Sequence, residues 1–262
     1  MKTTIFFLLM GSFVLSAIAD DSIVADYGKT VYPKQTDDIQ MLSEKVDVTF
    51  GENAEGCREA DVTCHFVFRN ATKSTVTATV GFPGNDSETG PGWSRPLSDF
   101  KASIGGKSIQ TKVKPEILWG DPKKDEHYGY KDWYIWEMTF PPKSDTVVDN
   151  SYAYCLSSNS GYGKLSLKYE LDTGANWRGK IGDAAVTVTY DDSDDLENRV
   201  IAIQPTGWVR KDNQILWHFK DLEPSTTDNI LIQEKNPESN MPNRSAPLLF
   251  KPPPPDTGDE PG

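Results

Sequence analysis

The chain has 262 residues, of which 39 are acidic and 27 are lysine or arginine, so its formal net charge at pH 7 is -12. Affinity for nucleic acid depends on lysine and arginine side chains that neutralise phosphates, so this balance excludes a nucleic-acid partner. The length is sufficient for one large domain or two small domains, each with its own hydrophobic core.

The first nineteen residues have the pattern of a secretory signal peptide. Lys2 precedes an apolar run over residues 5–15, and Ala17-Ile18-Ala19 is typical of a cleavage site. The run is too short to span a bilayer, and no later apolar stretch approaches the ~20 residues that a spanning helix needs. The sequence therefore predicts a secreted, soluble protein, periplasmic or extracellular, that does not insert into a membrane.

Three cysteines, Cys57, Cys64 and Cys155, follow the predicted signal peptide. An oxidising compartment favours a disulfide, and we predict a local bridge between Cys57 and Cys64 around an acidic turn over residues 58–61. A pairing with Cys155 is the alternative, and otherwise Cys155 is a buried thiol on a strand. No metal site is expected, because the cysteines lack C-x-x-C spacing and the three histidines lie far apart in sequence.

Apolar residues alternate with polar ones in short segments that are separated by Gly, Pro, Asn and Asp. This period of two predicts strands, and no segment after the signal peptide keeps the apolar stripe of a long helix. We therefore expect an all-β, antiparallel, β-sandwich-like fold with short helices or none. The first three segments are expected to form a meander, and Gly105-Gly106 predicts a hairpin turn. The expected strands cover residues 46–50, 62–68, 76–82, 100–104, 109–113, 133–140, 147–148, 152–154, 165–171, 184–190, 200–203, 215–219 and 229–233.

Pro141-Pro142 stops the most aromatic of these strands, and a boundary there would divide the chain into two lobes. The N-terminal β lobe would cover residues 20–145 and the C-terminal β lobe residues 146–235. One continuous sandwich is the alternative. Residues 236–262 form an acidic tail rich in proline, which we expect to be disordered; a spacer or a peptide ligand is the functional alternative.

Few segments carry the signature of a reaction. The acidic run over residues 191–195 lacks the ligand spacing of a calcium loop, so it is interpreted as a solvated turn. No G-x-S-x-G motif occurs, and no cofactor motif was found. A carbohydrate hydrolase that uses two carboxylates stays open as an alternative, because sequence alone does not place two acids across a cleft.

The seven tryptophans suggest where a ligand could bind. Trp136 and Trp217 lie on apolar faces and are interpreted as core, whereas others lie in loop-like contexts and could offer ring faces. The longest irregular stretch, residues 118–134, adds further aromatic candidates. The predicted binding residues are Trp93, Trp119, His127, Tyr128, Tyr130 and Trp177.

Three short motifs are similar to those of a known family. They are residues 169–182, Ile39-Gln40-Met41 with Glu44, and Val80-Gly81-Phe82-Pro83. With them the chain resembles, over most of residues 20–235, a family of secreted bacterial proteins known only as a domain of unknown function. The resemblance implies an export signal and a bacterial envelope location, and it brings no catalytic residues with it. After its Phe-Pro the family usually continues with another proline and an acidic residue, whereas this chain has Gly84-Asn85-Asp86.

In a eukaryotic source, Asn70, Asn85 and Asn243 would be glycosylation acceptors. The expected role is non-enzymatic binding, or structural support in the envelope or medium, with an unknown protein or glycan as the partner. A structure can separate this role from that of a hydrolase. A cleft with two facing carboxylates, one with a raised pKa, would favour the hydrolase, and a shallow aromatic patch would favour binding.

Overall fold

The computed structural model shows an all-β chain, as the alternating pattern predicts. Its described residues form seventeen strands, one α-helix and one 3₁₀-helix. The predicted signal peptide and the proline-rich tail lie outside the described residues. The described residues are 22–27, 30–33, 38–53, 56–87, 97–119, 129–159, 164–191 and 193–235.

The strands belong to three sheets. The eight-stranded sheet contains, in spatial order, β15 (Val209–Lys211), β16 (Gln214–Leu222), β13 (Ile181–Thr189), β3 (Ile39–Glu52), β4 (Arg58–Asn70), β10 (Asp145–Cys155), β6 (Ser98–Ile104) and β7 (Lys107–Ile109). The five-stranded sheet contains β2 (Thr30–Pro33), β1 (Ser22–Tyr27), β5 (Val76–Ser87), β9 (Gly129–Phe140) and β8 (Lys112–Trp119). The four-stranded sheet contains β11 (Ser157–Asn159), β12 (Lys164–Tyr169), β17 (Ile230–Lys235) and β14 (Val200–Gln204).

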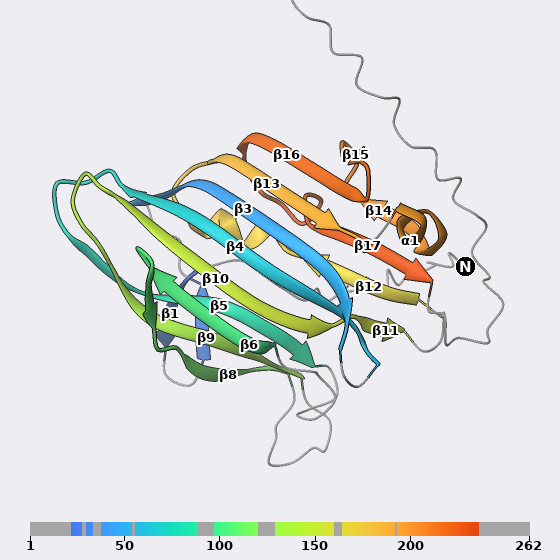
Figure 1. The fold of residues 1–262 in the computed structure, drawn as a ribbon. Helices are drawn as coiled ribbons and strands as arrows, with labels where there is room; N and C mark the ends of the chain where they lie inside the picture. Colours follow the sequence, from blue (N-terminus) through green and yellow to red (C-terminus); the bar gives the residue numbers. More distant parts are fainter. Residues whose placement is uncertain are drawn as a thin grey trace, which may run out of the picture.

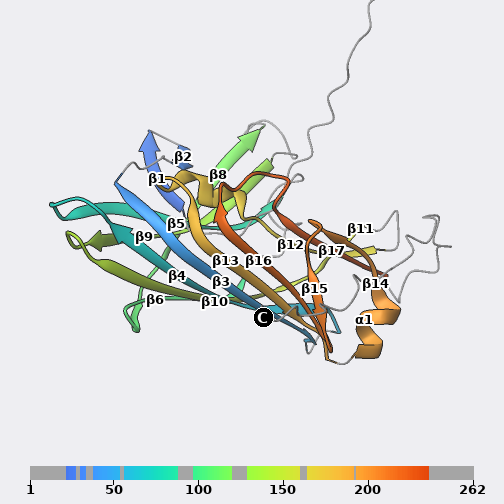
Figure 2. The same ribbon diagram turned by 90° about the horizontal axis from the view of Figure 1, so that it is seen from above.

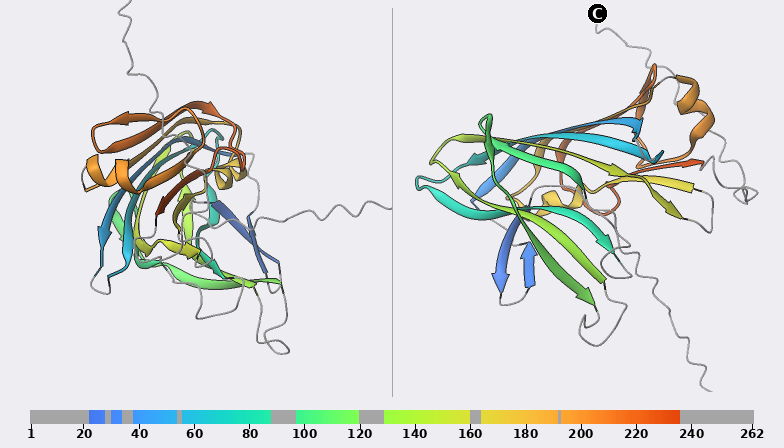
Figure 3. Two further views of the ribbon diagram at one scale, coloured as in Figure 1. Left: turned by 90° about the vertical axis from the view of Figure 1, so that its right-hand side faces the viewer. Right: turned by 60° about the horizontal axis from the view of Figure 1, so that its bottom comes forward.

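The long strands of the eight-stranded sheet run side by side across the molecule, and the two smaller sheets lie against one side of it (Figures 1 and 3). The ring of Phe82 on β5 lies 5.2 Å from that of Tyr152 on β10, which joins the five-stranded sheet to the large sheet. The four-stranded sheet is joined to it through Tyr169 on β12, which bonds Glu44 on β3. One hydrophobic core contains buried residues from all three sheets.

The proposed lobe boundary does not separate sheets. Strands β3, β4, β6 and β7 precede residue 145, β13, β15 and β16 follow it, and all seven belong to the eight-stranded sheet with β10 (Figure 2). The inner pair β3–β13 is parallel, with Val46 opposite Val186, and is an exception to the antiparallel pairing of the other described strands. A parallel pair cannot be closed by a hairpin, and local patterns therefore do not reveal it.

The expected meander is also wrong after its second strand. Strands β3 and β4 form a hairpin, but β5 pairs with β1 and β9 in the other sheet. The chain changes sheet at a turn built by Asn70, which is fully buried. Its Oδ1 accepts bonds from Thr72 N and Oγ1 at 2.9 and 2.7 Å, and its Nδ2 donates to the carbonyl of Phe140 at 2.9 Å. Asn70, which was considered as a glycosylation acceptor, therefore has a structural role in this turn. The Gly105-Gly106 hairpin is confirmed, and both glycines have the positive φ that this turn needs.

The predicted bridge between Cys57 and Cys64 is wrong. Cys57 pairs with Cys155 at a Cα–Cα distance of 5.9 Å, and Cys64 is the buried free thiol. Residues 58–61, taken for a turn, are the first residues of β4. Seven extended residues cover roughly 23 Å, whereas a disulfide needs Cα atoms within about 7 Å. Cys155 lies opposite Glu59 at the end of the antiparallel partner β10, so it comes close to Cys57.

Two short helices replace predicted turns. The acidic run over residues 191–195 leads into α1 (Ser193–Arg199), whose Leu196 is fully buried. The helix η1 (Asp172–Asn176) follows β12 and leads into the buried Trp177. In both cases one apolar residue holds a polar segment against the core. The described residues contain no helix with the length and hydropathy needed to cross a bilayer.

Candidate functional site

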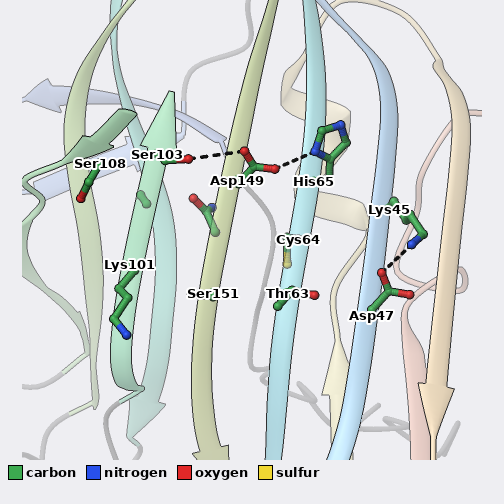
Figure 4. Close-up of a pocket in the computed structure, with 12 residues that line it drawn as sticks. Lys45, Asp47, Thr63, Cys64, His65, Lys101, Ser103, Ser108, Asp149 and Ser151 are labelled. Carbon is green, nitrogen blue, oxygen red and sulfur yellow. Dashed lines mark hydrogen bonds and ion pairs between the residues drawn. The ribbon is translucent and has the colours of Figure 1, made fainter. Parts of the chain in front are cut away.

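The outward face of the eight-stranded sheet carries an open concavity of about 560 Å³. It lies over β3, β4, β10, β6 and β7, and most of the residues that line it stand on pleats that point away from the core (Figure 4). Cys64, Ala102 and Asn150, which also line it, are buried. On β4, for example, Val62 and Cys64 are buried, whereas Thr63 and His65 are exposed. The alternation that builds the core thus also builds this surface, which we call the polar concavity.

One row of residues crosses the concavity in register. Ser103 lies opposite Asp149, Asp149 lies opposite His65, and His65 lies opposite Lys45. The Nδ1 atom of His65 lies 2.6 Å from Asp149 Oδ1, and the hydroxyl of Ser103 donates to Asp149 Oδ2 at 3.4 Å. We call these four residues the His65 row. Because Asp149 engages Nδ1, the imidazole is oriented with Nε2 directed away from the carboxylate.

A second row lies two residues along the strands. Lys101 is opposite Ser151, Ser151 is opposite Thr63, and Thr63 is opposite Asp47. We call these four residues the Lys101 row. The carboxylate of Asp47 accepts a bond of 2.7 Å from Lys45, which connects the two rows. Figure 4 shows both rows as sticks across four neighbouring strands.

The geometry of the polar concavity provides hydrogen bonds and charges for recognition. Ser103 bonds Asp149 and not His65, so His65 is not placed to take the proton of Ser103 as a general base would. The ion pair of His65 and Asp149 is about half exposed, and solvent screens it. Among the described residues, no group of three or more His, Cys, Asp or Glu side chains could hold a metal ion.

A carboxyl group with a strongly raised pKa lies inside the molecule. Glu44 is 1 % exposed, and burial raises the pKa of its carboxyl to about 8, although the hydroxyl of Tyr169 donates to its Oε1 at 2.6 Å. The thiol of Cys64 lies 3.7 Å from the same hydroxyl. Glu44 points inward because a bulge between Met41 and Ser43 reverses the alternation of β3. This buried carboxyl belongs to the joint between two sheets and does not line the polar concavity.

Two of the three motifs that carry the family resemblance meet at this joint. The side chain of Gln40 donates to the carbonyl of Lys180, and the amide of Arg178 donates to the carbonyl of Ile39. Gly182 passes so close to β3 that a Cβ there would lie 2.8 Å from the carbonyl oxygen of Leu42. With the bond between Glu44 and Tyr169, these contacts give the first two motifs a structural role. We call this region the inner joint.

A second buried polar contact lies beside the disulfide. Arg58 follows Cys57, and its guanidinium lies 4.8 Å from the centre of the Phe50 ring. Its Nε is 3.5 Å from Glu234 on β17, a carboxylate with no exposed surface. The disulfide links the ends of β4 and β10 within the large sheet, and Arg58 connects this end of the large sheet to the four-stranded sheet.

Of the predicted binding residues, the structure describes the side chain of Trp177 alone. Trp177 is 1 % exposed, and its ring lies 4.3 Å from that of Phe68, so its assignment to a binding surface is wrong: η1 folds it into the core. Trp93, His127 and Tyr128 lie outside the described residues. Trp119 ends β8 and Tyr130 lies on β9; their side chains are not among those described. The core positions of Trp136 and Trp217 are confirmed.

Sequence reasoning missed the polar concavity. Its residues are short polar side chains at alternate strand positions, such as Thr63 on β4 and Ser151 on β10, and each is ordinary in its own segment. Only the register of β3, β4, β10 and β6 makes them neighbours. The polar residues at the outward positions of these strands can be recognised in the sequence. The order of the strands in the sheet cannot.

The fold and the concavity define an all-β protein with an open polar site on its largest sheet. Residues 19–127 match the family model described as a domain of unknown function, DUF4424, which confirms the resemblance to such a family. None of the curated proteins compared with the chain matches it.

Solved structures show where this fold occurs. A crystal structure from Legionella pneumophila, described as a "putative nutrient binding protein", is similar with a TM-score of 0.57 and 20% identity, over 81% of this chain and 72% of that chain. At this identity the similarity shows the fold alone. An M1 zinc metallopeptidase from Deinococcus radiodurans matches at a TM-score of 0.36 and 12% identity, over 77% of this chain and 43% of that chain, and this similarity carries no argument.

Proposed function

We propose that this protein is a non-enzymatic binding protein that acts outside the cytoplasm and holds a small polar solute in the polar concavity. The observation that carries the proposal is the concavity of about 560 Å³ with two rows of polar side chains in register. Its size lies within the range of about 300–1,000 Å³ typical of ligand sites. The description of the Legionella protein as nutrient binding is compatible with this role.

The location outside the cytoplasm is supported by two independent features. Residues 1–19 have the order of charges and apolar residues of a signal peptide. The disulfide between Cys57 and Cys155 fits an oxidising compartment, where such bonds persist. N-terminal sequencing of the protein isolated from its own cells tests the export: a first residue of Asp20 is expected, and an intact Met1 in the mature pool contradicts it.

The binding itself can be tested with a variant that fills the concavity. Ser151 lies in the middle of the Lys101 row, so Ser151→Tyr would occupy the space of a ligand. Thr49→Tyr places the same ring on an exposed position of β3 outside the concavity and is the matched control. Native mass spectrometry of protein incubated with the small-molecule fraction of its growth medium measures the bound mass. We expect the wild type and Thr49→Tyr to retain a solute and Ser151→Tyr to lose it; equal behaviour of both variants contradicts the proposal.

The alternative role as a carbohydrate hydrolase receives less support. It requires two carboxylates that face each other across an accessible cleft, one of them with a raised pKa. Glu44, whose pKa is raised to about 8, is buried in the inner joint. In the polar concavity, Asp47 is engaged by Lys45 and Asp149 by His65. A binding role does not require either carboxylate to leave its partner.

A further inference from the structure

We infer that the solute is a hydroxylated carboxylate, of the class of sugar acids, and that Lys101, Ser151 and Thr63 hold its carboxylate group. This inference rests on the proposed function and specifies the ligand of the same site. We call the three residues the anion subsite. Their positions on β6, β10 and β4 are adjacent in register.

The charges of the polar concavity leave one cation available. Asp47 is paired with Lys45 at 2.7 Å, and Asp149 is paired with His65 at 2.6 Å. Within the described part of the chain, the ammonium group of Lys101 has no carboxylate partner within ion-pair distance, and its side chain is exposed. A ligand that enters the concavity therefore meets Asp47 paired with Lys45, Asp149 in contact with His65, and the exposed ammonium group of Lys101 at one end of the Lys101 row.

Two hydroxyl groups stand beside that cation. Ser151 is directly opposite Lys101, and Thr63 is directly opposite Ser151. Neither hydroxyl makes a side-chain hydrogen bond to another described residue. Neighbouring strands lie ~4.8 Å apart, so the long lysine side chain and the Ser151 hydroxyl can both reach one carboxylate. A charge-assisted bond from the ammonium is the stronger of these contacts.

The residues of the His65 row are placed to hydrogen-bond the hydroxyl groups of the ligand. It lies two residues along the strands, which places it about 6.7 Å from the anion subsite. Asp149 orients His65 so that Nε2 is available to a ligand hydroxyl, and the hydroxyl of Ser108 on β7 also lines the concavity. The residues that line the concavity include no Phe, Tyr or Trp, so hydrogen bonds rather than stacking on such rings would hold the solute.

The overall charge of the protein makes this local cation decisive. The chain carries a net charge of -12, which disfavours anions at its surface in general. Selection of a carboxylate thus depends on Lys101 and the adjacent hydroxyls. Replacement of this one ammonium group should abolish the preference for an acidic over a neutral sugar.

Calorimetric titration of the disulfide-bonded protein at low salt tests the inference with D-glucuronate, D-glucose and acetate. We expect glucuronate to bind at least about tenfold more tightly than glucose, a difference of about 1.4 kcal/mol. Lys101→Gln should reduce glucuronate affinity to that of glucose, and Ser151→Ala should weaken it less. Lys107→Gln, an exposed lysine on β7 outside the concavity, is the matched control and should bind as the wild type does.

Each other outcome overturns the inference. Equal affinity for glucose and glucuronate, or equal effects of Lys101→Gln and Lys107→Gln, removes the anion subsite. Acetate binding as tight as that of glucuronate removes the contribution of the His65 row, and no binding of any of the three probes rejects the ligand class. In all these cases the comparison of Ser151→Tyr with Thr49→Tyr on natural solutes still decides the proposed function separately. Thermal unfolding of every variant confirms that it is folded.

Discussion

The polar concavity and the inner joint use similar side chains in opposite environments. In the concavity, the pair of His65 and Asp149 is about half exposed and solvent screens its charges. In the inner joint, Glu44 is buried and its pKa is about 8. The two regions lie on opposite faces of strands of the same sheet. The face of the pleat on which a polar group lies therefore decides whether that group contributes to recognition or to stability.

The disulfide should have the largest effect on stability. Cys57 and Cys155 are separated by 98 residues, and a loop of this length corresponds to roughly 4 to 5 kcal/mol in the chain-entropy model. We expect the double variant with Cys57→Ser and Cys155→Ser to lose stability of this order in urea denaturation. Cys64→Ala is the control, since it removes a thiol that forms no disulfide. A Cys57–Cys64 peptide in a non-reducing digest would contradict the pairing.

Glu44 should make the stability of the protein depend on pH. Its pKa is about 8 in the folded state against an ordinary value of 4.5, so the folded state holds a proton that the unfolded chain releases. The contribution of Glu44 to the free energy of unfolding is fully present below pH 4.5. It falls as the pH rises towards 8, by at most about 1.4 kcal/mol per pH unit. We expect Glu44→Gln to remove this decline.

Urea denaturation of the wild type and of Glu44→Gln at pH 4, 6 and 9 measures the effect. The difference between the two proteins isolates Glu44 from the other titrating groups. We expect the free energy of unfolding of Glu44→Gln to increase relative to that of the wild type as the pH rises. A constant difference between pH 4 and pH 9 would show that the buried carboxyl does not titrate in this range.

Trp177 should matter through packing alone. Its ring contacts Phe68 and Phe140 inside the core, so Trp177→Ala should cost about 3 to 5 kcal/mol. Trp177→Phe keeps part of the ring volume and should cost less. Thermal unfolding measures both variants. A loss of solute binding by Trp177→Phe at unchanged stability would restore Trp177 to the binding surface and reject its role in the core.

The smallest stability effect is expected in the polar concavity. Asp149→Asn removes a half-exposed ion pair, and such pairs contribute about 0 to 1 kcal/mol. We therefore expect nearly unchanged unfolding in urea together with weaker binding of the solute, because His65 loses its orientation. A loss of more than 2 kcal/mol would contradict the contrast between the two regions.

The alternating pattern predicted the buried faces well. Leu165, Leu167, Tyr169 and Leu171 were expected on one face and are all buried, since a strand places every second residue on the same side. The pattern failed at the bulge in β3, where one extra residue turns Glu44 inward. The candidate site was not predicted, because Lys101 and Asp47 are neighbours only through two intervening strands.

Local physical chemistry in the sequence thus determined the fold class, through short alternating strands with turns of glycine and proline, and it predicts an export signal. Tertiary structure alone decided which strands are neighbours. The pairing of Cys57 with Cys155, the parallel contact of β3 with β13 and the burial of Trp177 all follow from that order. The reason is physical: alternation depends on nearest neighbours in the chain, whereas strand order depends on how the sheets together bury one core.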